Sequence, residues 1–213
     1  MNTTLNPSAR RLIEEAVEWR LIGLLLERPT EQWREGLPYV AHEAGDEELR
    51  AAAQVAVHDA SEGEYLRAFG PGGRVSPREI AHTQTRDPGH VLAQLGAMYE
   101  AFAYRPHTEE TPDHVSVETG FVAYLRLKQA FAVACDNDEH ARTAADAAAA
   151  FVERHLSTFV EPLTQRVSDD EGHYMASALR ALLRRTGPRR HDREGGWTPD
   201  GLDAACLTCP GCE

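Results

Sequence analysis

The apolar residues of this chain recur at helical spacing over most of its length, and this pattern constrains the fold more than any other feature. Between residues 7 and 28 they form one broad face, made of Leu12, Ile13, Ala16, Val17, Leu21 and Leu24. No stretch of useful length alternates apolar and polar residues, which is the pattern of a half-buried strand. We therefore expect an all-α fold, a single helical bundle over residues 1–186. Residues 187–213 are rich in Pro, Gly and charge and should form a flexible tail.

Capping residues and helix breakers divide the bundle into segments. The expected helices span about residues 7–28, 30–42, 46–59, 61–70, 88–104, 113–135, 139–159 and 170–185. Ser8 and Asp46 should cap two of them, because side-chain oxygens at these positions accept the free N–H groups of the first turn. The turn-rich run Pro71-Gly72-Gly73 predicts a loop that crosses over the bundle.

The charge and the composition narrow the kinds of partner. With 34 acidic and 22 basic residues the formal net charge is −12, which favours a basic peptide over nucleic acid, although the same charge also keeps a protein soluble. The longest apolar block, residues 21–26, is far too short for membrane insertion. Arg10 and Arg11 precede Leu-Ile-Glu-Glu, so we expect no export signal here, and the cysteine usage suits a reducing cytoplasm.

One helix carries most of the polar chemistry. Thr111 is expected to cap it, which places Asp113 in the first turn, where the helix dipole favours a negative charge. His114 and Glu118 are four residues apart and should stack on one face, which Phe121 continues. The face can line a groove with a polar end and an apolar floor. The same face also fits a capped core helix with one internal His–Glu pair.

Several motifs resemble those of one family. Residues 112–121 contain Pro112, Asp113, His114, Glu118 and Phe121 in the order P-D-H-x-x-x-E-x-x-F, which resembles the signature of the TorD/DmsD/NarJ-type chaperones. Upstream, Tyr65 and Phe69, then a glycine-proline loop and Glu79, resemble a second family motif in which Ala68, Ser76 and Ile80 depart from the pattern. Tyr99 fits a third motif, in which the glycine expected four residues later is Ala103 here. Residues 151–162 resemble F-x-x-x-H-L-x-x-W-x-P with Phe159 in the tryptophan place. His155 in this motif is expected to be a hydrogen-bonded histidine of the core or rim. The resemblance covers about residues 11–185.

The resemblance implies a function without catalysis. Members of the family are all-helical cytoplasmic proteins that bind the twin-arginine signal peptide of a molybdopterin oxidoreductase catalytic subunit during cofactor insertion and assembly. No nucleophile–base pair, phosphate loop or closed metal site is visible in the sequence, so we expect a binding protein and not an enzyme. Whether two chains form a homodimer stays open.

The expected peptide-binding residues combine carboxylates with aromatic groups. Asp113, Glu118 and Glu79 would accept hydrogen bonds from the leader's guanidinium groups, and His114 would orient Glu118. Tyr65, Phe69, Tyr99 and Phe121 would supply an apolar and stacking surface. For Tyr65 and Phe69 ordinary core packing is the competing interpretation. Glu109 and Glu110 add negative charge just before this helix.

Three cysteines close the sequence. Cys206, Cys209 and Cys212 have the two-residue spacing that lets thiolates converge on zinc or an iron–sulfur cluster, but such sites normally take four ligands. A redox-reactive or disordered tail is the alternative. The tail supports a second functional hypothesis, a metal-binding or redox-sensing helical adaptor. A third is that arginines at 184–185 and 189–190 fold back and block an acidic groove.

Overall fold

The computed structural model describes residues 6–83, 87–167 and 173–188, and within them every regular element is helical. The α-helices are α1 (Pro7–Leu25), α2 (Glu31–Glu43), α3 (Glu47–Asp59), α4 (Glu62–Phe69), α5 (Pro88–Ala101), α6 (Val115–Ala134), α7 (Asp138–Phe151), α8 (Ser157–Arg166) and α9 (His173–Thr186). A 3₁₀ turn, η1 (Glu79–Ala81), and a π-helical turn, η2 (Val152–Leu156), complete the set. The predicted all-α bundle is confirmed, and the described residues include no strand.

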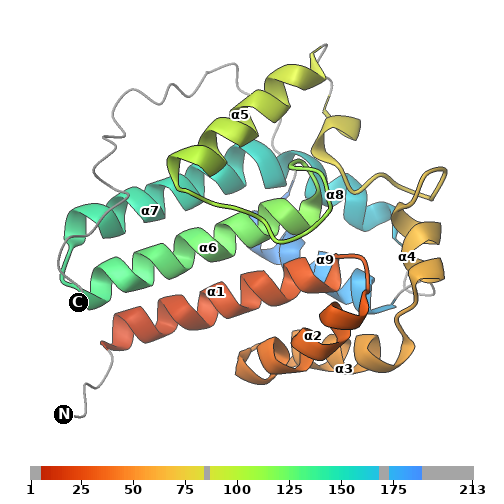
Figure 1. Cartoon of the computed structure of the whole chain (residues 1–213), viewed down its shortest axis with the longest axis horizontal. Helices are drawn as coiled ribbons and strands as arrows, with labels where there is room; N and C mark the ends of the chain where they lie inside the picture. The colour runs from red at the N-terminus through yellow and green to blue at the C-terminus, as the bar shows by residue number, and fades with distance from the viewer. Residues whose placement is uncertain (1–5, 84–86, 168–172, 189–213) are drawn as a thin grey trace.

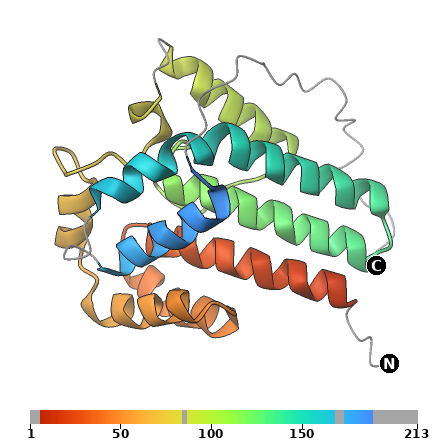
Figure 2. The same cartoon turned by 180° about the vertical axis from the view of Figure 1, so that it is seen from behind.

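Helices α1 and α6 form the centre of the bundle and run side by side (Figure 1). They approach closely because α1 carries glycine at the crossing: a Cβ on Gly23 would lie 3.1 Å from the carbonyl oxygen of Ser116. Helix α7 covers the other side of α6, and α9 packs against α1, α3 and α8 on the face seen in Figure 2. Helices α2, α3 and α4 lie at the end of the bundle near the start of α6 (Figure 1).

Side-chain caps begin most of these helices where the sequence predicts. Thr30, Asp46, Ser61 and Asn137 each accept a backbone N–H of the first turn, as N-caps of α2, α3, α4 and α7. The first helix differs in detail, because Asn6 and not Ser8 is its cap. Local chemistry therefore sets most helix starts.

The start of α6 corrects one prediction. Thr111 does not cap the helix, and Asp113 precedes it, since the N-cap is His114, whose Nδ1 accepts the Ser116 N–H at 3.1 Å. The backbone before His114 is held elsewhere: the carbonyl of Asp113 accepts the N–H of Glu79 at 2.9 Å. The N-cap thus lies three residues later than predicted, at His114 instead of Thr111, where the tertiary contact holds the preceding backbone.

The helix predicted over 139–159 is also different in the structure. Helix α7 ends at Phe151, η2 inserts a wider turn, and α8 continues the direction through Pro162 to Arg166. The π turn brings His155 and Phe159 to the core, where their exposed fractions are 4% and 0%. Such single-turn π insertions re-aim side chains within an otherwise helical segment.

The core beside α6 is aromatic. The ring of Phe121 lies 4.8 Å from both Tyr99 and Phe151, centroid to centroid, and 5.2 Å from Tyr104. Edge-to-face packing of this kind adds to the burial energy of each ring. In the part of the chain that the structure describes, no helix is both long and apolar enough to cross a bilayer.

Candidate functional site

The loop after α4 is pinned to the start of α6 by main-chain contacts. Arg78 and His114 form an isolated antiparallel bridge, in which the Val115 N–H donates to the Pro77 carbonyl and the Glu79 N–H to the Asp113 carbonyl, both at 2.9 Å. Gly72 turns the loop at a φ of +76°, a conformation that side chains with a Cβ disfavour. The bridge places Arg78 and Glu79 directly over the residues that precede α6.

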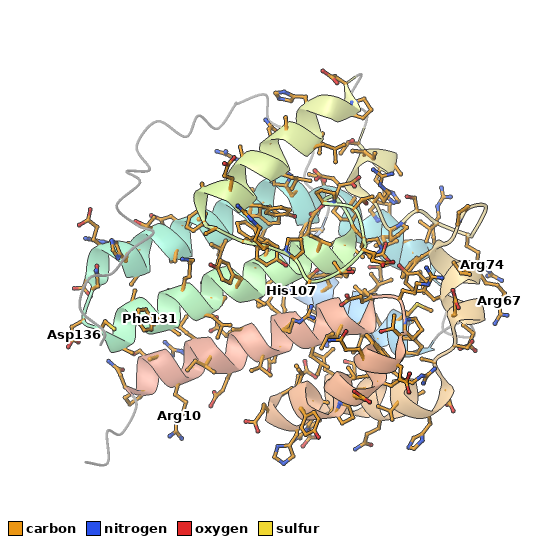
Figure 3. The ribbon with its side chains drawn as sticks, viewed as in Figure 1. Arg10, Arg67, Arg74, His107, Phe131 and Asp136 are labelled. Carbon is orange, nitrogen blue, oxygen red and sulfur yellow. The ribbon has the colours of Figure 1, made fainter. Side chains whose placement is uncertain are left out.

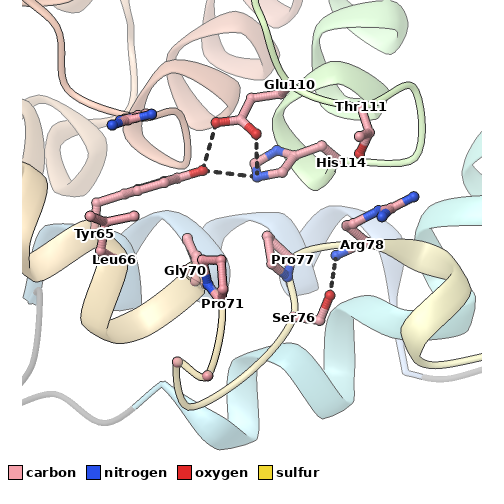
Figure 4. Close-up of a pocket in the computed structure, with 14 residues that line it drawn as sticks. Tyr65, Leu66, Gly70, Pro71, Ser76, Pro77, Arg78, Glu110, Thr111 and His114 are labelled. Atoms are coloured by element: carbon pink, nitrogen blue, oxygen red, sulfur yellow. Dashed lines mark hydrogen bonds and ion pairs between the residues drawn. The ribbon is translucent and has the colours of Figure 1, made fainter.

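A hydrogen-bond triangle joins α4 to this junction (Figure 4). The Tyr65 hydroxyl donates to Glu110 Oε1 at 2.9 Å and lies 3.0 Å from His114 Nε2. Because His114 Nδ1 accepts the Ser116 N–H, we assign the imidazole proton to Nε2, which then donates to the Tyr65 oxygen. The three side chains are therefore mutually oriented.

Burial controls the protonation of this triangle. Desolvation lowers the pKa of His114 from 6.5 to about 4, although the negative charges of Glu110 and Asp113 oppose the shift. His114 is thus neutral at neutral pH. Burial, followed by the charge of Glu110, raises the pKa of Tyr65, which keeps its hydroxyl proton available for donation. The predicted pairing of His114 with Glu118 does not form, since the histidine nitrogens contact Tyr65 and Ser116 instead.

Three carboxyl groups lie buried behind the triangle. Asp113 is 0% exposed and accepts Nε of Arg78 at 3.0 and 3.2 Å, one distance to each oxygen. Glu79 is 2% exposed and pairs with Nδ1 of His155 at 3.0 Å, as expected for a hydrogen-bonded core histidine. Glu118 is fully buried, and no described donor reaches either of its oxygens.

Glu118 is the unusual member of this set. Desolvation, followed by the charges of Glu79 and Asp113, raises its pKa well above the ordinary value. The raised pKa favours the protonated carboxyl, whose O–H can donate to Glu79. Asp113 and Glu79 thus have nitrogen partners, Arg78 and His155, whereas no described donor reaches Glu118.

A pocket of about 520 Å³ opens beside the triangle. The lining residues come from α4, the following loop and the segment before α6 (Figure 4): Arg28, Tyr65, Leu66, Phe69, Gly70, Pro71, Gly72, Gly73, Ser76, Pro77, Arg78, Glu110, Thr111 and His114. The wall is apolar on the α4 side, where Phe69 packs edge-on against Tyr65 at 5.5 Å between centroids. Glu110 contributes a carboxylate to the lining of the pocket, and its side chain is 24% exposed.

The predicted site residues divide into two groups. Tyr65, Phe69 and His114 line the pocket, whereas Glu79, Asp113 and Glu118 do not and are covered in this conformation. Tyr99 and Phe121 belong to the aromatic core, and the Tyr99 hydroxyl donates to the Pro112 carbonyl at 2.8 Å. Their contacts are those of core residues, so neither faces the pocket in this conformation.

Sequence reasoning missed the pocket roles of Arg28, Arg78 and Glu110. The acidic pair at 109–110 was a usable signal for Glu110, because it marks negative charge next to the α6 start. Nothing local identified Arg78, whose partner Asp113 is 35 residues away.

The cysteine predictions fall outside the described residues. Cys206, Cys209 and Cys212 are not among them, so zinc or iron–sulfur binding stays a prediction. Within residues 6–83, 87–167 and 173–188, no group of three His, Cys, Asp or Glu side chains is arranged to hold a metal ion. Arg184 contacts Glu48 at 2.9 Å and Arg185 contacts Glu18 at 2.8 Å, on α3 and α1, and neither lines the pocket.

Comparison with known proteins gives this geometry a family context. The model of the nitrate reductase delta subunit family matches residues 38–165, which include all eight predicted peptide-binding residues. The chain is 32% identical over 122 residues to the selenate reductase assembly chaperone protein of Thauera selenatis, covering 55% of this chain and 62% of that protein. It is 32% identical over 118 residues to the chlorate reductase assembly chaperone protein of Ideonella dechloratans, covering 53% and 60%. The alignments thus span somewhat under two thirds of each relative.

The family match extends over more than half of the sequence, from the middle of α2 into α8, and contains the loop, the bridge and the start of α6. It agrees with the resemblance seen in the motifs at 65–79 and 112–121. The chain belongs to the nitrate reductase delta subunit family.

Proposed function

We propose that this chain is a cytoplasmic assembly chaperone that binds the catalytic subunit of a molybdopterin oxidoreductase through its twin-arginine leader and holds it for cofactor insertion. The names of the two relatives, assembly chaperones of a selenate and a chlorate reductase, support this class of client. A chaperone of this kind binds and releases its client and carries out no reaction on it.

The pocket beside α4 supports a peptide with a basic group next to apolar ones. Arginine presents a planar fork of N–H donors and needs a carboxylate that is partly shielded from water. Glu110 meets this requirement, because its carboxylate lines the pocket and is already oriented by Tyr65. Phe69, Pro71 and Pro77 provide an apolar wall for the residues that follow the arginines. This juxtaposition is the observation that carries the proposal.

In this proposal the predicted residues have two kinds of role, contact with the leader and support of the junction. We assign first contact with the leader to Glu110, Tyr65 and Phe69, which face the pocket. His114 orients Tyr65 and does not orient Glu118. Asp113, Glu79 and Glu118 support the junction from behind in the conformation described. The acidic net charge of −12 adds a long-range attraction for a basic leader.

Calorimetric titration with two synthetic leader peptides tests the proposal. One peptide carries two consecutive arginines before an apolar run, and the other has both arginines replaced by lysine. Glu110→Gln should weaken binding of the arginine peptide at least about tenfold, because truncating one partner of a partly desolvated charge pair costs roughly 2–5 kcal/mol. The amide oxygen of the variant can still accept the Tyr65 hydroxyl.

Glu109→Gln is the matched control, since Glu109 is exposed, makes the same change of charge and does not line the pocket. Its affinity should stay within about twofold of the unaltered protein, as for an exposed charge on the rim. Equal affinities of both variants, or no preference for arginine over lysine in the peptide, would reject the assignment of this pocket.

A further inference from the structure

The strongest further feature is the guanidinium that the chain itself places against Asp113. Arg78 lines the pocket with a side chain that is 37% exposed, while the Asp113 side chain is 0% exposed. Arg78 is therefore the solvent-facing member of the pair and separates the pocket from the buried carboxylate. The Asp113 carboxylate therefore already binds a guanidinium, which is the group that a leader arginine would bring.

The pair is not the strongest that these groups can make. The contacts between them use a single donor, Nε, shared between the two carboxylate oxygens at 3.0 and 3.2 Å. A fork of two parallel N–H···O bonds is the preferred arginine–carboxylate geometry. An incoming guanidinium that presents two N–H groups has better geometry available at the same carboxylate.

Displacement of the Arg78 side chain would leave its backbone in place. The two main-chain hydrogen bonds of the bridge to His114 hold residues 77–79 without help from the guanidinium. The neighbouring Glu79 is separately fixed by His155. Among the residues that line the pocket, Arg78 is the one whose side chain contacts the Asp113 carboxylate, so its rotation is the movement that the subsite needs.

A second acceptor lies behind the first. Both oxygens of the fully buried Glu118 lack a described hydrogen-bond donor, and Asp113 is among the charges that act on Glu118. Even with its O–H directed to Glu79, Glu118 keeps one oxygen without a donor, and a buried acceptor left in this way is costly and uncommon in folded proteins. An arginine that entered at Asp113 would bring donors toward this group.

We propose that Asp113 is a second guanidinium subsite for the client, and that Arg78 occupies it until a client arginine displaces it. The inference rests on the proposed function and deepens it. The leader carries two guanidinium groups: Glu110 takes one at the open pocket, and Asp113 takes the other after Arg78 moves aside. Because Arg78 competes for Asp113, the apparent affinity is lower than the intrinsic affinity by the fraction of molecules in which the subsite is open.

Titration of the full chain with the two peptides tests this mechanism. Arg78→Gln removes the competitor, so the arginine peptide should bind on the order of tenfold more tightly if the subsite is open in about a tenth of the molecules. The lysine peptide should gain much less, since an ammonium cannot form the two-pronged contact. Thermal unfolding of each variant shows whether it is folded.

Arg67→Gln is the matched control. Arg67 projects from α4 with a side chain 72% exposed, at the same end of the molecule, and is outside the pocket lining (Figure 3). Arg67→Gln changes the net charge by the same amount as Arg78→Gln, so any gain in its affinity for the arginine peptide measures long-range electrostatics alone. The double variant Arg78→Gln/Asp113→Asn should lose the gain of Arg78→Gln, because the acceptor is then neutral.

The outcomes separate the two levels of the proposal. Arginine-selective binding by the unaltered protein with no gain in Arg78→Gln beyond that of Arg67→Gln overturns the second subsite and leaves the proposed function standing. A gain that persists in the double variant also overturns it. Absence of arginine-selective binding in the unaltered protein and in Arg78→Gln overturns both.

Discussion

The substitution Glu118→Gln should stabilise the protein, and increasingly so as the pH rises. Glu118 is fully buried and faces Glu79, Asp113 and Tyr99, whose own partners are His155, Arg78 and the Pro112 carbonyl. Burial among these groups favours the protonated carboxyl, whereas in the unfolded chain it ionises freely. Glutamine has nearly the same shape, never ionises, and can donate an N–H to Glu79.

The size of the effect follows from proton linkage. Burial raises the pKa of Glu118 in the folded protein above the ordinary value of 4.5, so its favourable contribution is complete below that pH and is lost as the pH rises toward the folded pKa. Over that window the unaltered protein loses about 1.4 kcal/mol per pH unit from this group, while the variant loses none. The difference in unfolding free energy should therefore grow as the pH rises above 4.5 toward the folded pKa.

Urea denaturation followed by circular dichroism at pH 5, 6 and 7 measures this difference. Other titrating groups largely cancel because both proteins contain them. Glu109→Gln, an exposed carboxylate close in sequence, should show almost no pH-dependent difference. If the Glu118→Gln difference is the same at all three pH values, Glu118 is ionised in the folded protein and our reasoning about the buried carboxyls is wrong.

Two further predictions concern the junction and the helix crossing. Burial lowers the pKa of His114 from 6.5 to about 4, so the stability that the neutral imidazole contributes is complete above pH 6.5 and is lost as the pH falls, by roughly 3 kcal/mol in all. The unaltered protein should therefore lose its stability advantage over His114→Asn, which keeps a capping oxygen, between pH 6.5 and pH 4. At the α1–α6 crossing, Gly23→Val should cost about 1–3 kcal/mol by overpacking against the Ser116 carbonyl, whereas Gly36→Ala, with open space around the added carbon, should gain about 0.5–1 kcal/mol. Urea denaturation checks both, and a persistent His114 advantage at pH 4 or a neutral Gly23→Val would contradict them.

Much of the secondary structure was predictable because its causes are local. Thr30, Asp46, Ser61 and Asn137 act on N–H groups two or three residues away, so the sequence shows both partners at once. The helix starts at α2, α3, α4 and α7 agree with the prediction for that reason. The start of α6 does not, because the residues that would form its first turn bond to the loop at 77–79.

The candidate site was predictable only in part. The family motifs mark Tyr65, Phe69 and His114, and the structure places all three at one pocket. The burial of Asp113 and Glu118 was not predictable from the sequence. A carboxylate near a helix start is expected to be accessible to solvent. In the structure Arg78 covers Asp113, and Glu118 is buried in the core.

The sequence by itself determined that the chain is helical, acidic and divided at its capping residues, because periodicity, charge and caps are properties of neighbouring residues. Only the tertiary structure decided which carboxyl groups face a ligand. Partners of Asp113 and Glu79 lie 35 and 76 residues away in sequence, and their approach sets burial, protonation and access together. Desolvation depends on every atom that surrounds a group, and those atoms come from all parts of the folded chain.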